Sequence, residues 1–137
     1  MFSSTVAAST LLIALTNSAQ SVPARYLEMH AVEIKLVEQT NQQRIAHGLL
    51  PLKLDNGLMK SARRHTAWMT NTNSFVHTSD PVAENIAYGA SNTEHAIDMW
   101  MNSPGHRANM LGGYRRIGVA AYVAQDGTTY WCQQFLD

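Results

Sequence analysis

The sequence lacks the features on which several protein classes depend. A single cysteine, Cys132, excludes an internal disulfide, so the 137-residue chain is not a small secreted fold stabilised by cystines. Ten basic and ten acidic side chains give no formal net charge, and without a basic stripe we expect no nucleic-acid partner. Motifs for dinucleotides, nucleoside triphosphates, zinc proteases, thioredoxin-like redox centres and α/β-hydrolases are also missing. These absences leave most common enzyme classes without support.

The first 21 residues differ from the rest and predict an export signal. An uncharged apolar run between Thr5 and Thr16 is followed by small and polar residues that suit a signal peptidase. The run spans about ten residues, against about 20 needed to cross a bilayer, so no transmembrane segment is predicted. No Lys or Arg precedes the run, which departs from a usual signal peptide and leaves a disordered start as the alternative. We expect a secreted or extracytoplasmic protein with a signal peptide over residues 1–21 and one domain over residues 26–137.

Apolar residues at helical spacing predict a largely helical first part of that domain. Four helices are expected: Tyr26 to His47, Asp55 to the Asn71–Ser74 cluster, Ser91 to Ser103, and Pro104 to Gly112–Gly113. Asp55 suits an N-cap, and Ser91 with Glu94 has the spacing of a capping box. Ser103 is expected to cap the last helix, with Pro104 in its first position.

The end of the chain predicts a β-hairpin. Residues 117–124 and 128–135 have the composition of strands, and Asp126–Gly127 is typical of a two-residue turn. This turn would place Val123 opposite Tyr130 and Ala121 opposite Cys132. Both faces of the hairpin carry apolar side chains, so we expect helices to cover the sheet on both sides.

Three titratable residues stand out in the middle of the chain, where periodicity is weak. They are His77, Glu84 and His106, and the spacing around them predicts loops, with His106 in the first turn of the fourth helix.

Several motifs in order resemble the bacterial branch of the CAP superfamily, whose domain is also called SCP. The matching segments are FVH ending at His77, AENIA at 83–87, WMNSPGHRANML at 100–111 and YWCQQF at 130–135. The similarity covers roughly Glu33 to Phe135. It implies an α+β fold, a three-layer α-β-α sandwich with a mainly antiparallel central sheet, and an extracytoplasmic location.

The resemblance also implies a cleft. CAP domains hold two His and two Glu residues that in several members bind zinc or another divalent ion. His77, Glu84 and His106 match three of the four positions, whereas Ser103 stands where many eukaryotic members have the second Glu. The expected metal ligands are therefore His77, Glu84 and His106, with Zn²⁺ or another divalent cation as cofactor. Asn85, Ser103 and Arg107 are expected to line the cleft.

Two nitrogens and a carboxylate can hold Zn²⁺ and leave one position for water. Without metal, Glu84 would favour the charged forms of nearby histidines and make the cleft pH-sensitive. A purely structural alternative has Glu84 and His106 bonding buried backbone groups. We expect a monomeric, non-catalytic protein that binds a metal and a small-molecule, lipid or peptide ligand, with lipid binding implied only by the resemblance. The alternatives are a metal-assisted hydrolase and an interaction module with a vestigial cleft.

Other polar residues have simpler interpretations. Ser103 is expected to cap a helix and not to act as a nucleophile, and His65 to be a hydrogen-bonded core residue. Arg107 is expected to form a salt bridge near the third helix, and Cys132 to be a buried thiol.

Overall fold

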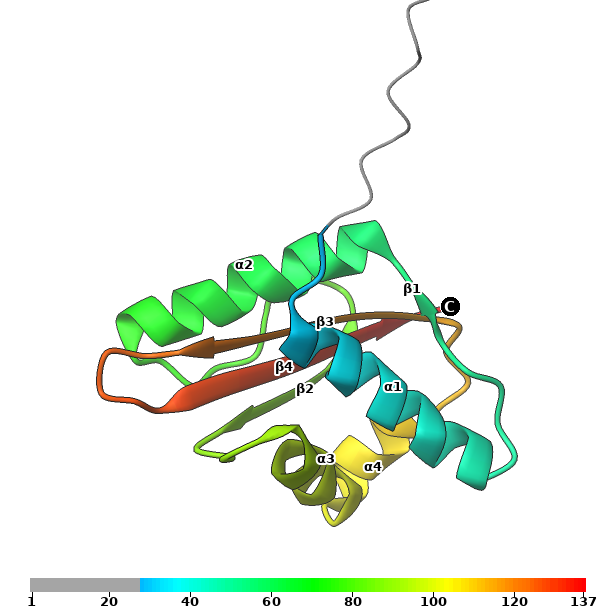
Figure 1. Cartoon of the computed structure of the whole chain (residues 1–137). Helices are drawn as coiled ribbons and strands as arrows, with labels where there is room; N and C mark the ends of the chain where they lie inside the picture. The colour runs from blue at the N-terminus through cyan, green and yellow to red at the C-terminus, as the bar shows by residue number, and fades with distance from the viewer. Residues whose placement is uncertain (1–27) are drawn as a thin grey trace, which may run out of the picture.

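The computed structural model describes residues 28–137. In chain order the elements are α1 (Ala31–Ala46), β1 (Lys53–Leu54), α2 (Asn56–Thr72), β2 (Ala83–Tyr88), α3 (Thr93–Met101), α4 (Pro104–Met110), β3 (Arg116–Val123) and β4 (Thr129–Leu136). Figure 1 shows their arrangement. The predicted signal peptide lies outside the described residues and stays a prediction.

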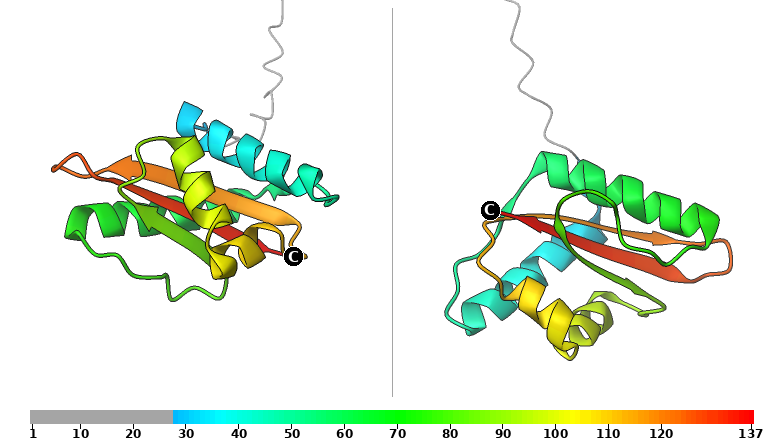
Figure 2. Two further views of the ribbon diagram at one scale, coloured as in Figure 1. Left: turned by 90° about the horizontal axis from the view of Figure 1, so that it is seen from below. Right: turned by 180° about the vertical axis from the view of Figure 1, so that it is seen from behind.

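The strands form one sheet in the order β1-β3-β4-β2. β4 pairs antiparallel with both β3 and β2, and only the two-residue β1 runs parallel to its neighbour β3. α2 covers one face of the sheet, while α1, α3 and α4 cover the other (Figures 1 and 2). The fold is therefore an α+β, three-layer α-β-α sandwich with a mainly antiparallel sheet, as expected.

Side chains from the two faces of the sheet enter two separate cores. The larger core contains the fully buried Trp100 and Phe135 and includes side chains of α1, α3 and α4. The smaller core lies under α2 and contains Ala62, Met69 and Cys132. Because both faces are covered by helices, the strands carry apolar residues on both sides and do not alternate with polar ones.

α2 lies unusually close to β3, and Gly118 makes this possible. A Cβ atom at Gly118 would lie 2.2 Å from the carbonyl carbon of Leu58 and 2.5 Å from the backbone nitrogen of Met59. Real Cβ atoms do not approach backbone so closely. Only glycine therefore allows this contact between the helix and the strand.

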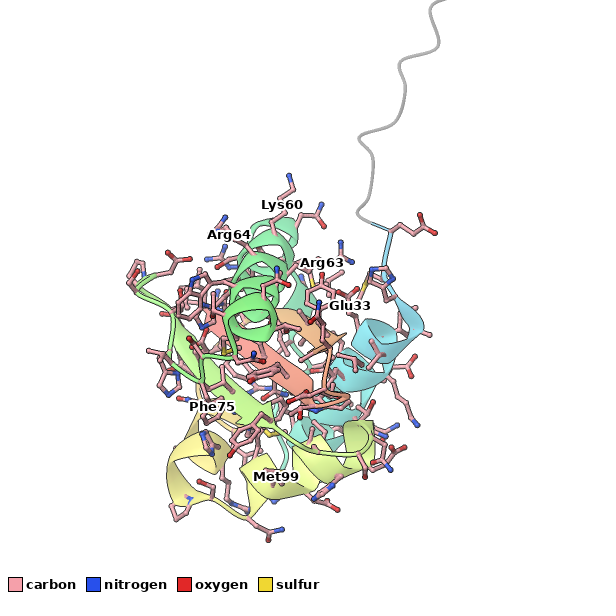
Figure 3. All side chains as sticks on the ribbon, turned by 90° about the vertical axis from the view of Figure 1, so that its left-hand side faces the viewer. Glu33, Lys60, Arg63, Arg64, Phe75 and Met99 are labelled. Atoms are coloured by element: carbon pink, nitrogen blue, oxygen red, sulfur yellow. The ribbon has the colours of Figure 1, made fainter. Side chains whose placement is uncertain are left out.

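A buried ion pair joins α1 to α2. Arg63 donates from Nε to Glu33 Oε1 at 2.7 Å and from Nη2 to Glu33 Oε2 at 2.6 Å, and the Glu33 side chain is only 1% exposed. Glu33 Oε2 also accepts from the backbone N–H of His30 at 2.9 Å, at the start of α1. The two side chains meet between the helices in Figure 3.

The helix predictions hold with small corrections. The first helix begins at Ala31 and not at Tyr26, since the described residues 28–30 before it are not helical. Asp55 caps α2, since its Oδ1 accepts from Leu58 N at 2.8 Å. The capping box at Ser91 was wrong, because Asn92 is the N-cap of α3 and its Oδ1 accepts from His95 N at 2.8 Å. Glu94, the other half of the expected box, instead pairs with Lys35 on α1 at 2.6 Å.

The predicted hairpin register was wrong by one residue. Val123 pairs with Thr129 and Ala120 with Cys132. The loop contains three residues, 125–127, because Ala124 and Thr128 are joined by a backbone hydrogen bond of 2.8 Å and Gly127 adopts a left-handed φ of 87°. A glycine in this conformation is typical of a three-residue hairpin loop and explains the shift.

The segment around Glu84 is a strand, not the expected loop. Residues 83–88 form β2, paired with β4 along its whole length. Four consecutive residues of β2, from Glu84 to Ala87, are buried, so the segment shows no alternation of apolar and polar residues that could reveal it. β2 forms one edge of the sheet, beside α3 and α4.

Candidate functional site

The carboxylate of Glu84 lies at the centre of a buried hydrogen-bond cluster on the α2 side of the sheet. Its Oε1 accepts from His77 Nδ1 at 2.8 Å and from Thr78 N at 2.9 Å. Its Oε2 accepts from Gln134 Nε2 at 2.9 Å and from Cys132 Sγ at 3.7 Å. Each carboxylate oxygen thus has two donors, so Glu84 is fully satisfied although it is buried.

Glu84 fixes the orientation of His77. Because His77 Nδ1 faces the carboxylate, the lone pair of the neutral ring lies on the other nitrogen, Nε2. The His77 side chain is 60% exposed although the carboxylate that it contacts is buried.

Two more side chains surround Glu84. His65 on α2 lies 3.9 Å from Glu84 Oε1, and its Nε2 bonds the carbonyl of Val76 at 2.7 Å, which holds the segment before His77. His65 is therefore a hydrogen-bonded, largely buried residue, as predicted.

The Cys132 thiol also lies against Glu84. Burial first, and then the Glu84 charge, raise the pKa of the Cys132 thiol well above its usual value. The prediction of a buried thiol is confirmed.

His106 lies on the other side of β2, in the first turn of α4. Its backbone carbonyl accepts from Asn85 Nδ2 at 3.0 Å. Burial lowers the pKa of the imidazole below its usual value, and nearby His77 lowers it further. The neutral ring is therefore favoured at pH 7, which is the form that binds metals.

Asn85 belongs to a second buried polar cluster, on the face opposite Glu84. Its Nδ2 also donates to Gln133 Oε1 at 3.0 Å, and its Oδ1 accepts from Asn109 Nδ2 at 2.9 Å. Gln133 Nε2 in turn donates to Thr40 Oγ1 on α1 at 2.7 Å. This cluster ties α4, and with it His106, to the sheet.

Successive side chains of a strand point to opposite faces, so Glu84 and Asn85 lie on opposite faces of β2 and each belongs to a different polar cluster. Among residues 28–137, no group of three or more His, Cys, Asp or Glu side chains is arranged to hold a metal ion. Glu84 joins His77 directly, whereas no hydrogen bond links the His106 ring to either of them within the described part of the chain. Four donors already occupy the Glu84 carboxylate, and one of them is the His77 ring, so Glu84 lies behind His77 as an orienting group.

A cavity of about 290 Å³ lies beside His106 at the outer edge of β2. It is mainly apolar and is lined by Phe75, Ile86, Ala87, Tyr88, Met99, Trp100, Ser103 and His106. The ring centroids of Phe75 and Tyr88 are 4.9 Å apart, and both residues are about half exposed, at 46% and 53%. Figure 3 shows Phe75 and Met99 on the same side of the molecule.

The remaining predicted residues lie in different places. Ser103 lines the cavity and is the N-cap of α4, but its side chain makes no capping hydrogen bond. Arg107 points to the end of α1, where its Nη2 lies 3.1 Å from His47 Nε2. The salt bridge expected for Arg107 near the third helix is not among the ion pairs of residues 28–137.

The model of the cysteine-rich secretory protein family, CAP, matches residues 37–135. The chain belongs to the CAP family. The uncharacterized protein YkwD of Bacillus subtilis is 37% identical over 139 aligned residues, covering 88% of this chain and 52% of YkwD. This CAP chain therefore spans about half the length of that relative.

Solved structures agree with the CAP assignment. An extracellular protein containing an SCP domain from Bacillus anthracis has a TM-score of 0.66 and 27% identity, covering 76% of this chain and 39% of that one. An outer surface protein of Borrelia burgdorferi has a TM-score of 0.68 with 18% identity, covering 74% of this chain and 89% of that one, and this likeness concerns the fold alone. No helix within residues 28–137 of this CAP domain is long and apolar enough to span a bilayer.

Sequence reasoning missed Gln133 and Gln134. Each glutamine contacts one of the two clusters, Gln133 on the Asn85 side and Gln134 on the Glu84 side. Two adjacent amides in an otherwise apolar strand were the available signal, because buried amides need polar partners.

Proposed function

We propose that this CAP domain is a non-catalytic binding protein that acts outside the cytoplasm and takes a ligand with an apolar part at the outer edge of β2. The observation that carries the proposal is the apolar cavity, which has the His106 residue in its wall. Cavities of this kind, mostly apolar with a few polar groups, are typical of small-ligand sites. A ligand could place an apolar group between Phe75 and Met99 and a polar group near His106.

The surroundings of Ser103 support binding over catalysis. The buried Glu84 carboxylate is paired with the exposed His77 ring, but the fourth family position is Ser103, and its hydroxyl makes no hydrogen bond to His77 or His106 within residues 28–137. A serine nucleophile needs a base within hydrogen-bond reach. The carboxylate and histidine therefore support recognition of a ligand or an ion.

We also propose a divalent cation near the cavity, held by His77 and His106. Nε2 of the exposed His77 side chain and the neutral ring of His106 would supply the nitrogens, with Glu84 orienting His77 from behind. A bound cation would supply Lewis acidity and open positions for a polar ligand group. With only two protein ligands we expect weak binding.

The location outside the cytoplasm rests on the apolar run in residues 5–16 and on the relatives. The similar SCP-domain protein of Bacillus anthracis is an extracellular protein. A culture that expresses the full chain should release a shortened form, which mass spectrometry of the medium would identify.

Nile red, a neutral apolar dye, tests the cavity. Its fluorescence should rise with the native protein, and Met99→Glu should abolish the rise by placing a charge on the cavity wall. Ile45→Glu is the matched control, because Ile45 is exposed on α1 away from the cavity. Equal loss in both variants, or no rise with the native protein, would contradict an apolar ligand site.

Calorimetric titration with Zn²⁺ tests the cation separately. His77→Ala and His106→Ala should each weaken binding at least about tenfold. His95→Ala serves as the control, since this histidine is exposed at the start of α3. If all three variants bind Zn²⁺ as the native protein does, the cation site is elsewhere, while the Nile red result stands on its own.

A further inference from the structure

A second hollow lies at the end of the molecule opposite the β3–β4 hairpin. It is a groove of about 820 Å³ between the α1–β1 loop and the α4–β3 loop, which lie together on the right of Figure 1. Leu50, Pro51 and Tyr114 provide apolar surface in it. The proposed function does not use this groove.

Arg44 lies at the base of the groove. The residue is only 3% exposed, and its guanidinium donates to the carbonyls of Leu50 at 2.9 Å, Met110 at 2.9 Å, Gly112 at 2.8 Å and Tyr114 at 3.3 Å. These partners are neutral, so carbonyl dipoles and no carboxylate balance the positive charge within residues 28–137. The same bonds hold the two loops together and make the groove a fixed feature of the fold.

Two exposed cations line the groove beside Arg44. Neither Lys53 nor Arg115 takes part in an ion pair within residues 28–137. A third cation, Arg116, pairs with Asp55 at 3.1 Å. Asp137 is the one acidic residue in the groove lining, although the chain as a whole carries equal numbers of acidic and basic residues. The groove is therefore a local concentration of positive charge on a neutral protein.

We propose that this groove binds an extended peptide in which acidic side chains alternate with apolar ones. Its volume lies within the range of about 300–1,000 Å³ for ligand sites, so a single inorganic anion would leave most of it empty. Carboxylates of the peptide would pair with Lys53 and Arg115, and apolar side chains would pack on Leu50 and Tyr114. A concave site suits a segment of chain better than a flat bilayer surface does.

A short fluorescent peptide in which glutamate alternates with leucine tests the proposal by fluorescence polarisation. The double variant Lys53→Glu, Arg115→Glu should weaken its binding at least about tenfold, because two attractive charge pairs become repulsive. The control is Lys60→Glu, Arg64→Glu, which changes the net charge equally on the outer face of α2 (Figure 3). The control should bind as the native protein does.

Three results would overturn the proposal. The first is an equal loss of peptide affinity in both double variants. The second is an equal affinity of the native protein for a peptide with glutamine in place of glutamate. The third is binding of phosphatidylglycerol vesicles through Lys53 and Arg115 without binding of the peptide. The milder pair Lys53→Gln, Arg115→Gln and a salt titration of the native protein do not depend on the folding of the reversed variant. Added salt should weaken the interaction if charge carries it. The groove shares no residue with the β2 cavity, so failure of either proposal leaves the other unchanged.

Discussion

Removing either partner of the Glu33–Arg63 pair should destabilise the protein strongly and unequally. Arg63→Met leaves a carboxylate that is 1% exposed with one remaining donor, the His30 N–H. Glu33→Met leaves a guanidinium that is 17% exposed and still donates to the Glu28 carbonyl. Breaking a buried pair costs about 3–5 kcal/mol, so we expect about 4 kcal/mol for Arg63→Met and about 3 kcal/mol for Glu33→Met.

Urea denaturation at pH 7 measures these costs. With a slope of about 1–3 kcal/mol per M, a loss of about 3 kcal/mol lowers the midpoint by about 1–3 M while the slope stays constant. The double variant Glu33→Met, Arg63→Met should cost clearly less than the sum, because no buried charge remains. Lys35→Met, which breaks the exposed pair with Glu94 between α1 and α3, is the matched control and should change the midpoint little.

The outcome that would refute this reasoning is additivity. If each single variant cost under about 1 kcal/mol and the double variant cost their sum, the pair would behave as a solvent-exposed ion pair. α1 and α2 would then be held together by apolar contacts alone.

Three further predictions concern other positions. Gly118→Ala should lower the free energy of unfolding by about 2 kcal/mol or more in urea melts, since its Cβ would collide with backbone 2.2 Å away, whereas Gly113→Ala, with open space around it, should not. Asp55→Ala should cost about 1 kcal/mol. The hydrogen bond from Leu58 N–H is the main reason why the pKa of Asp55 is below 3.8. The stabilisation that the charged Asp55 gives is therefore present above pH 3.8 and is lost as the pH falls further. An Asp55→Ala variant that melts like the native protein at pH 7 would contradict the cap. Iodoacetamide at pH 9 should leave Cys132 unmodified in the native protein, because its pKa is raised, and should alkylate it in urea; mass spectrometry that finds rapid native modification would show the thiol to be accessible.

The helices were predictable because their signals are local. Asp55, the Pro104 start of α4 and the left-handed Gly48 after α1 act within one turn of the chain. The hairpin register was not, because Asp126–Gly127 suits both two-residue and three-residue loops and the pairing of β3 with β4 decides between them.

The candidate site was only partly predictable. The motifs pointed to His77, Glu84 and His106, and the structure brings the first two into direct contact. They could not show that Glu84 is already occupied by four donors, because two of these, Gln134 and Cys132, come from β4, some 50 residues away in sequence. Neither pairing nor depth in the fold is visible in a local pattern.

By itself the sequence determined the four helices, the family and the residues around which a site is built, since capping groups, apolar spacing and motif order act over short distances. Tertiary structure alone decided that Glu84 and Asn85 face opposite sides of β2 and that Arg44 joins two loops under a cationic groove. The physical reason is that strand pairing and the burial of charge depend on residues distant in the chain, which meet only when the sheet and its two helical layers have packed together.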